Sequence, residues 1–269
     1  MGGLALMYTI VVTNDDGIHA PGIHKLVQSL DGLAELFVVA PDQERSAEGH
    51  RITVREGLMI QEHDFHGMKH VKAFSVNGTP ADCVKMGIHV ILQRRPDLVI
   101  SGINAGLNLG KDIYYSGTVS AAREAVINEI PAIAVSYDNF ICPGDFGEVD
   151  KILRPIWEEI KIRDIPVDVL LNMSVPHVPA NELLGVVATG LDIHHYRDRI
   201  DEKPGVRGEP EYWIERDYGK QKLTNQDYFM VENKYVTITP VHIDSTDYQF
   251  VKLMNGWKMM KSNMWRGKF

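Results

Sequence analysis

The stretch Tyr8-Thr-Ile-Val-Val-Thr-Asn-Asp-Asp-Gly17 decides the fold that we expect for this chain. Its first six residues are mostly β-branched and apolar, which is typical of a buried strand. Asp15 and Asp16 follow directly, so two carboxylates stand at the end of that strand. In an open α/β sheet, ligands bind in the crevice outside the carboxyl ends of the strands. Two neighbouring carboxylates there repel each other unless a cation or a shared proton compensates, and a divalent metal is the simplest compensation.

The same segment also fits a plain polar turn, because Asn, Asp and Gly are ordinary turn residues. The rest of the chain favours the sheet-edge interpretation, since strand and helix signals alternate along it. Helices are expected from Pro21, after Thr79, after Ser116 and over 149–160. Further strands are expected at 36–40, 97–101, 131–135, 169–172, 184–188 and 235–240. Apolar strands separated by helices predict an α/β fold, a three-layer Rossmann-like, mostly parallel sheet.

The second half of the sequence departs from this alternation in two places. Residues 192–230 are rich in charge, Gly and Pro with interspersed aromatic residues, and we interpret them as a protruding β-hairpin arm. Residues 245–269 carry much apolar surface and are interpreted as an oligomerisation tail, with a helix docked on its own domain as the alternative. We therefore predict one domain over 8–269, with its core at 8–190 plus the strand 235–240, and a disordered extension at 1–7.

Composition excludes several classes of function. The 269 residues carry a formal net charge of -8, which argues against binding a nucleic acid polymer. A small phosphorylated substrate remains compatible, because a metal can supply local positive charge. Cys83 and Cys142 form no metal-binding pattern, and a reduced, cytoplasmic setting fits them best. No apolar run is long enough to cross a bilayer, so no membrane partner is expected.

Four polar loops follow the predicted strands, and in a parallel sheet they converge on one edge although they are distant in sequence. Two carboxylates, a hydroxyl and a side-chain amide form an all-oxygen set, which suits Mg²⁺, Mn²⁺ or Ca²⁺ and not zinc or copper. A helix N-terminus with Ser-Gly-Thr offers an anion cradle, although simple N-capping is its ordinary explanation. The residues that carry these loops are Asn14, Asp15, Asp16, Arg45, Ser46, Asn104, Asn108, Ser116, Gly117 and Thr118.

These loops together resemble the motifs of the SurE family, the survival-protein nucleotidases. The resemblance is dense from about residue 8 to residue 135 and thinner afterwards, and long ordered motifs carry more weight than one short pattern. The matching segments are Thr13-Asn-Asp-Asp-Gly-Ile-His-Ala-Pro-Gly-Ile23, Ala40-Pro-Asp-Gln-Glu-Arg-Ser-Ala47, Val76-Asn-Gly-Thr-Pro-Ala-Asp-Cys-Val84, Pro96-Asp-Leu-Val-Ile-Ser-Gly-Ile-Asn-Ala-Gly-Leu-Asn-Leu-Gly110 and Tyr115-Ser-Gly-Thr-Val-Ser-Ala-Ala-Arg-Glu-Ala125.

The resemblance implies a metal-dependent phosphatase that acts on nucleoside 5'-monophosphates. It further implies activity on 3'-nucleotides and short polyphosphate. It implies one Mg²⁺ or Mn²⁺ per subunit, with Ca²⁺ able to occupy the same site. The implied metal ligands are Asp15, Asp16, Ser46 and Asn104, and the two aspartates are also the expected catalytic residues. The phosphate-facing group is Asn108, Ser116, Gly117 and Thr118, to which we add Asn14 and Arg45. The resemblance further implies a homodimer or homotetramer that exchanges C-terminal segments between subunits.

Other functions stay open at the level of sequence. A nucleoside hydrolase or an aspartyl-phosphate phosphatase also places aspartates after a first strand, but here the two aspartates are adjacent and not spaced as DxD. A nucleotide-sensing or metal-binding module without turnover is the alternative outside the enzymes. Among the eleven histidines, His50 is the best candidate to approach the site, because it follows the loop of Ser46.

Overall fold

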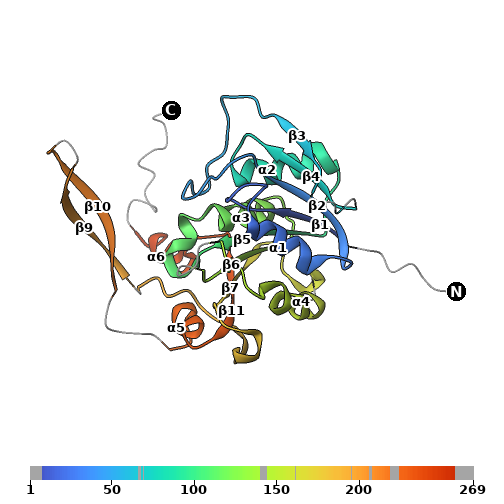
Figure 1. Cartoon of the computed structure of the whole chain (residues 1–269). Helices are drawn as coiled ribbons and strands as arrows, with labels where there is room; N and C mark the ends of the chain where they lie inside the picture. The colour runs from blue at the N-terminus through green and yellow to red at the C-terminus, as the bar shows by residue number, and fades with distance from the viewer. Residues whose placement is uncertain are drawn as a thin grey trace.

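The computed structural model describes residues 8–65, 68, 70–139, 144–160, 162–194, 196–205, 208–218 and 224–257. Within these residues, nine strands form one sheet in the order β3-β4-β2-β1-β5-β6-β7-β11-β8 (Figure 1). Its strands are β1 (Tyr8–Thr13), β2 (Ala34–Pro41), β3 (Ile60–His63), β4 (Lys72–Val76), β5 (Leu98–Ala105), β6 (Ala132–Tyr137), β7 (Val169–Val175), β8 (Gly185–Ala188) and β11 (Tyr235–His242).

Most neighbouring strands of the sheet are parallel. The run β4-β2-β1-β5-β6-β7 is parallel throughout, whereas β3 pairs antiparallel with β4 and β11 pairs antiparallel with β7. The predicted mostly parallel α/β fold is therefore confirmed. Strands β3 and β4 were not predicted, because the polar stretch between them fits a solvated loop or strand pair.

Helices cover both faces of the sheet, and each face has its own hydrophobic cluster. Side chains of α1 and α4 pack in one cluster with Ile10 and Val12 of β1, while α2 and α3 pack in the other with Val11. This alternation along β1 follows from the two-residue period of a strand. The helices are α1 (Pro21–Leu30), α2 (Pro80–Met86), α3 (Gly117–Ile127), α4 (Val149–Glu159), α5 (Asp227–Glu232) and α6 (Tyr248–Met254), and the short helical turns are η1 (Gly87–Leu92), η2 (Gly110–Tyr114), η3 (Ile162–Asp164) and η4 (Ala180–Glu182).

Local sequence accounts for the start of two helices. Thr79 caps α2: its hydroxyl accepts from the backbone N–H of Asp82, and the Asp82 carboxylate accepts from the N–H of Thr79. Ser116 caps α3 by accepting from the N–H of Val119 at 3.1 Å. Such caps satisfy N–H groups that the first helical turn leaves without a partner.

Chain order explains where a ligand site forms. From β1 the chain passes through α1 to β2 on one side, and β5 then joins the other side of β1. The strand order therefore reverses between β1 and β5, which is the position where open α/β sheets bind ligands. Asp15 and Asp16 follow β1, and Asn104 lies at the end of β5.

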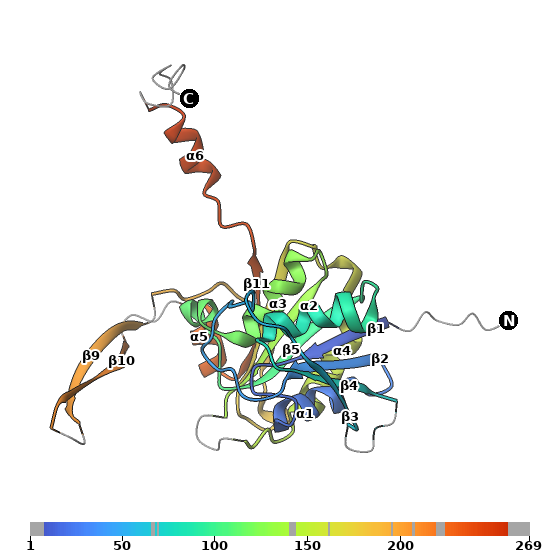
Figure 2. The ribbon, with the colours of Figure 1, turned by 90° about the horizontal axis from the view of Figure 1, so that it is seen from above.

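Two segments extend from the body of the molecule. Strands β9 (Tyr196–Pro204) and β10 (Pro210–Tyr218) pair antiparallel as a hairpin that projects away from the sheet (Figures 1 and 2). Helix α5 begins within the predicted arm of 192–230 but has buried residues, so the extended part is the hairpin alone. Helix α6 also points away from the body and has no buried residue (Figure 2).

Candidate active site

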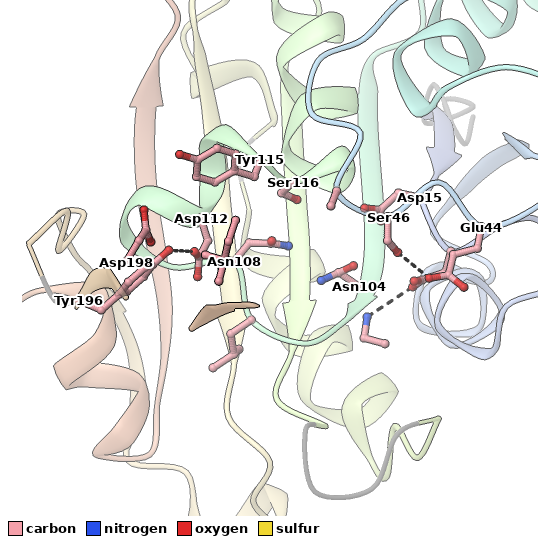
Figure 3. Close-up of a pocket in the computed structure, with 15 residues that line it drawn as sticks. Asp15, Glu44, Ser46, Asn104, Asn108, Asp112, Tyr115, Ser116, Tyr196 and Asp198 are labelled. Atoms are coloured by element: carbon pink, nitrogen blue, oxygen red, sulfur yellow. Dashed lines mark hydrogen bonds between the residues drawn. The ribbon is translucent and has the colours of Figure 1, made fainter. Parts of the chain in front are cut away.

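A cleft of about 780 Å³ opens at the switch point of the sheet. Asp15, Asp16, Ser46, Asn104, Asn108 and Ser116 line it, so the structure brings these predicted site residues together. They come from the ends of β1, β2 and β5 and from the start of α3 (Figure 3). The convergence expected for the carboxyl ends of parallel strands is thus present.

Asp15 is held firmly at the base of the cleft. It is 3% exposed, and one carboxylate oxygen accepts a short hydrogen bond from the hydroxyl of Thr118. Its backbone oxygen accepts from the N–H of Arg45 at 2.7 Å. Burial raises the pKa of the Asp15 carboxyl, and hydrogen bonds led by that of Thr118 oppose the rise. The bond to Thr118 fixes the orientation of the carboxylate.

Asp16 is less enclosed than Asp15. Its Oδ2 accepts from the N–H of Ala105 at 3.4 Å. Burial, the charge of Asp15 and the charge of Glu44 raise the pKa of Asp16 to about 6. A bound cation would relieve the repulsion between the two carboxylates, since a neighbouring opposite charge favours ionised acids.

The other two expected metal ligands have suitable donors. The Ser46 hydroxyl donates to Glu44 Oε1 at 2.9 Å, so its oxygen lone pairs are left to accept or coordinate. The amide nitrogen of Asn104 donates to the oxygen of Gly106 at 2.6 Å, and its side-chain oxygen turns toward the side of Ser46 and Asp15 (Figure 3).

Within the described chain, no group of three or more His, Cys, Asp or Glu residues is arranged to hold a metal ion. The four expected metal ligands include only two carboxylates, and the other two donors are a hydroxyl and an amide oxygen. All four donors are oxygen atoms, which fits a hard cation such as Mg²⁺, Mn²⁺ or Ca²⁺.

Gly117 lets the start of α3 approach Asp15 closely. A Cβ atom at Gly117 would lie 2.8 Å from the Cβ and Oδ2 atoms of Asp15. Thr118 is fully buried and bonds to the same carboxylate. Gly117 and Thr118 therefore support Asp15 from below the cleft, whereas Tyr115 and Ser116 line the cleft itself.

Two further predicted residues lie outside the cleft lining. The Asn14 side chain is buried and bonds twice to Gly17, donating to its oxygen at 2.8 Å and accepting from its N–H at 3.2 Å. The Arg45 guanidinium lies 3.6 Å from Asp42 and 3.7 Å from Glu48. Asn14 thus shapes the bend after β1, while Arg45 braces its own loop.

His50 also takes a place that the sequence analysis did not foresee. Its Nε2 atom lies 2.9 Å from an oxygen of Glu124, a residue of α3 that is 3% exposed. Lys85 reaches the same carboxylate at 2.6 Å. His50 therefore ties the loop of Ser46 to α3 and is not among the described residues that line the cleft.

Sequence reasoning missed part of the cleft. Glu44, Asp112, Tyr115, Tyr196, Asp198 and Ile214 also line it. Glu44 and Tyr115 adjoin residues that had been selected, so their neighbourhood was a usable signal. Tyr196, Asp198 and Ile214 belong to the hairpin, and no local pattern links the hairpin to the sheet edge. Among the described lining residues five are acidic and none is Lys, Arg or His.

Comparison with known proteins decides the family. The family model described as "Survival protein SurE" matches residues 10–198, which is more than half of the chain. The chain belongs to the SurE family. The family resemblance expected from the sequence is thereby confirmed.

Several SurE proteins are similar to the chain over most of its length. A Brevibacillus brevis protein named 5'-nucleotidase SurE is 44% identical over 263 residues, covering 94% of this chain and 97% of that protein. A protein of the same name from Heliobacterium modesticaldum is 41% identical, with 92% and 91% coverage. The crystal structure of SurE from Aquifex aeolicus superposes with a TM-score of 0.81 at 37% identity, covering 94% of this chain and 100% of that one.

Proposed function

We propose that this chain is a divalent-metal-dependent 5'-nucleotidase, which hydrolyses nucleoside 5'-monophosphates to a nucleoside and phosphate. The observation that carries the proposal is the pair Asp15 and Asp16 beside the N-terminus of α3 in one cleft. The names of the similar proteins from Brevibacillus brevis and Heliobacterium modesticaldum support the same activity.

Asp15, Asp16, Ser46 and Asn104 would hold the cation, which we propose to be Mg²⁺ or Mn²⁺, with Ca²⁺ able to bind. When bound, the cation supplies positive charge to the phosphoryl oxygens and makes a water molecule more acidic. The requirement for a cation agrees with the charge of the cleft, because its described lining is acidic and the substrate is an anion.

The chain's own residues would orient the reactants. The Ser116 hydroxyl would bind a phosphoryl oxygen at the positive end of α3, and Asn108 would contribute from the adjacent loop. Thr118 occupies one oxygen of Asp15, so we assign Asp15 to fixed positioning. Asp16 is less enclosed and is assigned to orienting the attacking water and accepting its proton.

We extend the proposal to nucleoside 3'-monophosphates and short polyphosphate. The groups assigned to the phosphate recognise a phosphoryl oxygen and not its attachment point, which supports this range of substrates. Oxygen-18 water together with acid trapping tests the chemistry of the step: we expect the label in released phosphate after a single turnover and no phosphorylated aspartate in the quenched protein. Label in the carboxylate of Asp15 or Asp16 would indicate a covalent aspartyl-phosphate in place of direct attack by water.

Product analysis tests the function itself. Incubation of the purified protein with AMP and Mn²⁺ is expected to give adenosine and inorganic phosphate in equal amounts. Release of free adenine would indicate cleavage of the glycosidic bond. Tight binding of AMP without any product would indicate a sensor and would refute the proposed enzyme.

We also propose that the chain forms a homodimer or homotetramer that exchanges its C-terminal segment. Helix α6 supports this proposal, because Tyr248, Phe250 and Leu253 are 62%, 48% and 66% exposed. The alternative that this helix docks on its own domain does not agree with its lack of buried residues. The tail beyond residue 257 lies outside the described residues. Light scattering of a chain ending at Asp247 is expected to show a smaller assembly, and an unchanged mass for a folded variant would refute the exchange.

No helix in the described part of the chain is both long enough and apolar enough to span a membrane.

A further inference from the structure

The cleft has two chemically different sides. Asp15, Ser46 and Asn104 lie on one side, while Tyr115, Tyr196 and Asp198 lie on the other (Figure 3). The second side also includes the apolar side chain of Ile214, which β10 contributes. Tyr115 is 62% exposed and Ile214 is 76% exposed, so both can contact a ligand in the cleft. We call Tyr115, Tyr196 and Ile214 the hairpin-side wall.

A buried carboxylate holds this wall in place. Asp112 is 7% exposed, and its Oδ1 accepts a short hydrogen bond from the hydroxyl of Tyr196 at the base of the hairpin. Its Oδ2 accepts from the hydroxyl of Tyr228 in α5 at 3.2 Å. Asp112 therefore joins the η2 turn of the sheet edge to two separate later segments.

Asp112 is also connected to the phosphate side of the cleft. Its backbone oxygen accepts from the N–H groups of Tyr115 at 3.0 Å and Ser116 at 3.1 Å. The same residue thus fixes the cap of α3 through its backbone and the hairpin through its side chain. A shift of the hairpin relative to the start of α3 would have to break these bonds.

Lys111 strengthens the same junction from its other face. Its ammonium lies 3.9 Å from the centroid of the Tyr196 ring and 3.6 Å from a carboxylate oxygen of Asp198. A cation over an aromatic face is attractive, and more so when the ring is buried, as Tyr196 is at 5% exposed. Tyr196 is consequently held at its hydroxyl and over its ring, which limits its own contact with a ligand.

We propose that the hairpin-side wall receives the base of the nucleotide, and that Tyr196 and Asp112 are positioning residues that hold Tyr115 and Ile214 against it. The proposal rests on the proposed 5'-nucleotidase function, because the phosphate must lie at Asp15 and Asp16. An exposed aromatic ring and an aliphatic side chain favour the flat face of any base, so the wall recognises a base without distinguishing one base from another.

Paired substrates separate base binding from catalysis. AMP and ribose 5-phosphate share the sugar and the phosphate, and ribose 5-phosphate lacks the base. We expect Ile214→Ala to raise the KM for AMP by about 5- to 20-fold, because it removes an apolar contact with the base. Tyr196→Phe is expected to raise this KM by a similar factor, because it removes the hydrogen bond to Asp112 that positions the wall. Their kcat for AMP and their kcat/KM for ribose 5-phosphate are expected to stay within about twofold.

Two variants on the same hairpin serve as controls. Ile200 is the cross-strand partner of Ile214 and is 59% exposed, but it is not among the described residues that line the cleft. Tyr212 is an exposed tyrosine of β10 that likewise lies outside that lining. Ile200→Ala and Tyr212→Phe are expected to leave the KM for AMP and the kcat/KM for ribose 5-phosphate unchanged. Circular dichroism confirms folding, and the exposed Ile214 keeps the test available if Tyr196→Phe does not fold.

Calorimetry with adenosine makes the result independent of turnover. The wild-type protein is expected to bind adenosine, and Ile214→Ala to weaken that binding by the same factor as it raises the KM for AMP. Equal losses of kcat/KM for AMP and ribose 5-phosphate in Ile214→Ala would refute base binding at the hairpin-side wall. An unchanged KM for AMP would refute it as well. If the wild-type protein releases phosphate from neither substrate, the proposed function fails, and adenosine binding alone then tests the hairpin-side wall. Adenosine binding that Ile214→Ala weakens would support the wall. Absence of adenosine binding would refute it.

Discussion

Replacing Asp16 with asparagine is expected to stabilise the metal-free protein while it removes a catalytic residue. In the metal-free state, burial and the charge of Asp15 raise the pKa of Asp16 from 3.8 to about 6. The difference corresponds to roughly 3 kcal/mol, at 1.36 kcal/mol for each pH unit. Because Asp16 is only half-buried, solvent screening reduces this figure, and we expect the Asn variant to gain about 1–2 kcal/mol at pH 7.5.

The sign of the pH dependence follows from the direction of the shift. An acid whose pKa is raised on folding binds more protons in the folded state between its two pKa values. The free energy of unfolding therefore falls as pH rises from about 4 to about 6, and the cost is fully present above that range. The raised pKa of Asp15 acts in the same direction. Metal binding to the folded state opposes the loss, because it stabilises that state by mass action.

Urea denaturation of chelator-treated protein between pH 4.5 and pH 7.5 measures this effect. The readout is the difference in the free energy of unfolding between Asp16→Asn and the wild type. Taking this difference cancels the contributions of other ionisable groups. We expect this difference to increase with pH and the addition of Mn²⁺ to stabilise the wild type more than the variant. Asp64→Asn, at an exposed carboxylate, is the matched control and should show no such trend. A variant that is less stable than the wild type at pH 7.5, or a difference that does not vary with pH, would refute the reasoning.

Three further predictions concern residues around the cleft. Gly117→Ala places a Cβ 2.8 Å from Asp15 and should destabilise the protein by about 1–3 kcal/mol and lower kcat at least tenfold, whereas Gly57→Ala, with no atom within 4 Å, should do neither. Glu124 is buried, which by itself raises its pKa, but hydrogen bonds from His50 and Lys85 outweigh burial and lower it. Glu124→Ala should therefore cost about 3 kcal/mol near pH 7 and progressively less as pH falls below about 4.5, and a loss in urea melts that does not depend on pH would contradict this. Arg45→Lys should change the KM for AMP less than about threefold, because the guanidinium lies against Asp42 and Glu48, and a large rise in KM would place it on the substrate.

The sequence predicted the sheet well where the signal is local. The run from Tyr8 to Thr13 is apolar and β-branched, and Thr79 followed by Pro80 indicates the start of α2. The short strand β4 escaped prediction because it follows a polar stretch that fits a solvated loop. Tertiary pairing with β2, and not local preference, makes it a strand.

The site residues were likewise predictable only where the local sequence places them at the end of a strand. Residues directly after strands were predicted to converge because parallel strands end at one edge, and Asp15, Asp16 and Asn104 do so. The roles of Asn14 and Arg45 depend on which way a side chain turns within a loop, and neither residue's type nor its spacing settles that direction. Tyr196 and Ile214 reach the cleft because the hairpin is anchored beside it. The anchoring bond joins Tyr196 to Asp112, which lie 84 residues apart in the sequence, so no local pattern could predict it.

Phosphate release from AMP as a function of Mn²⁺ concentration, with wild type and Asp15→Asn measured side by side, tests whether Asp15 holds a catalytic cation. Asparagine keeps the size of Asp15 and removes its charge, so the bend after β1 is preserved. We expect saturable, metal-dependent release by the wild type and a loss of at least about a hundredfold in the variant, the scale observed when one group that stabilises the charge of a transition state is removed. Release by the variant at the wild-type rate, or release by the wild type that does not depend on added metal after chelation, would contradict it.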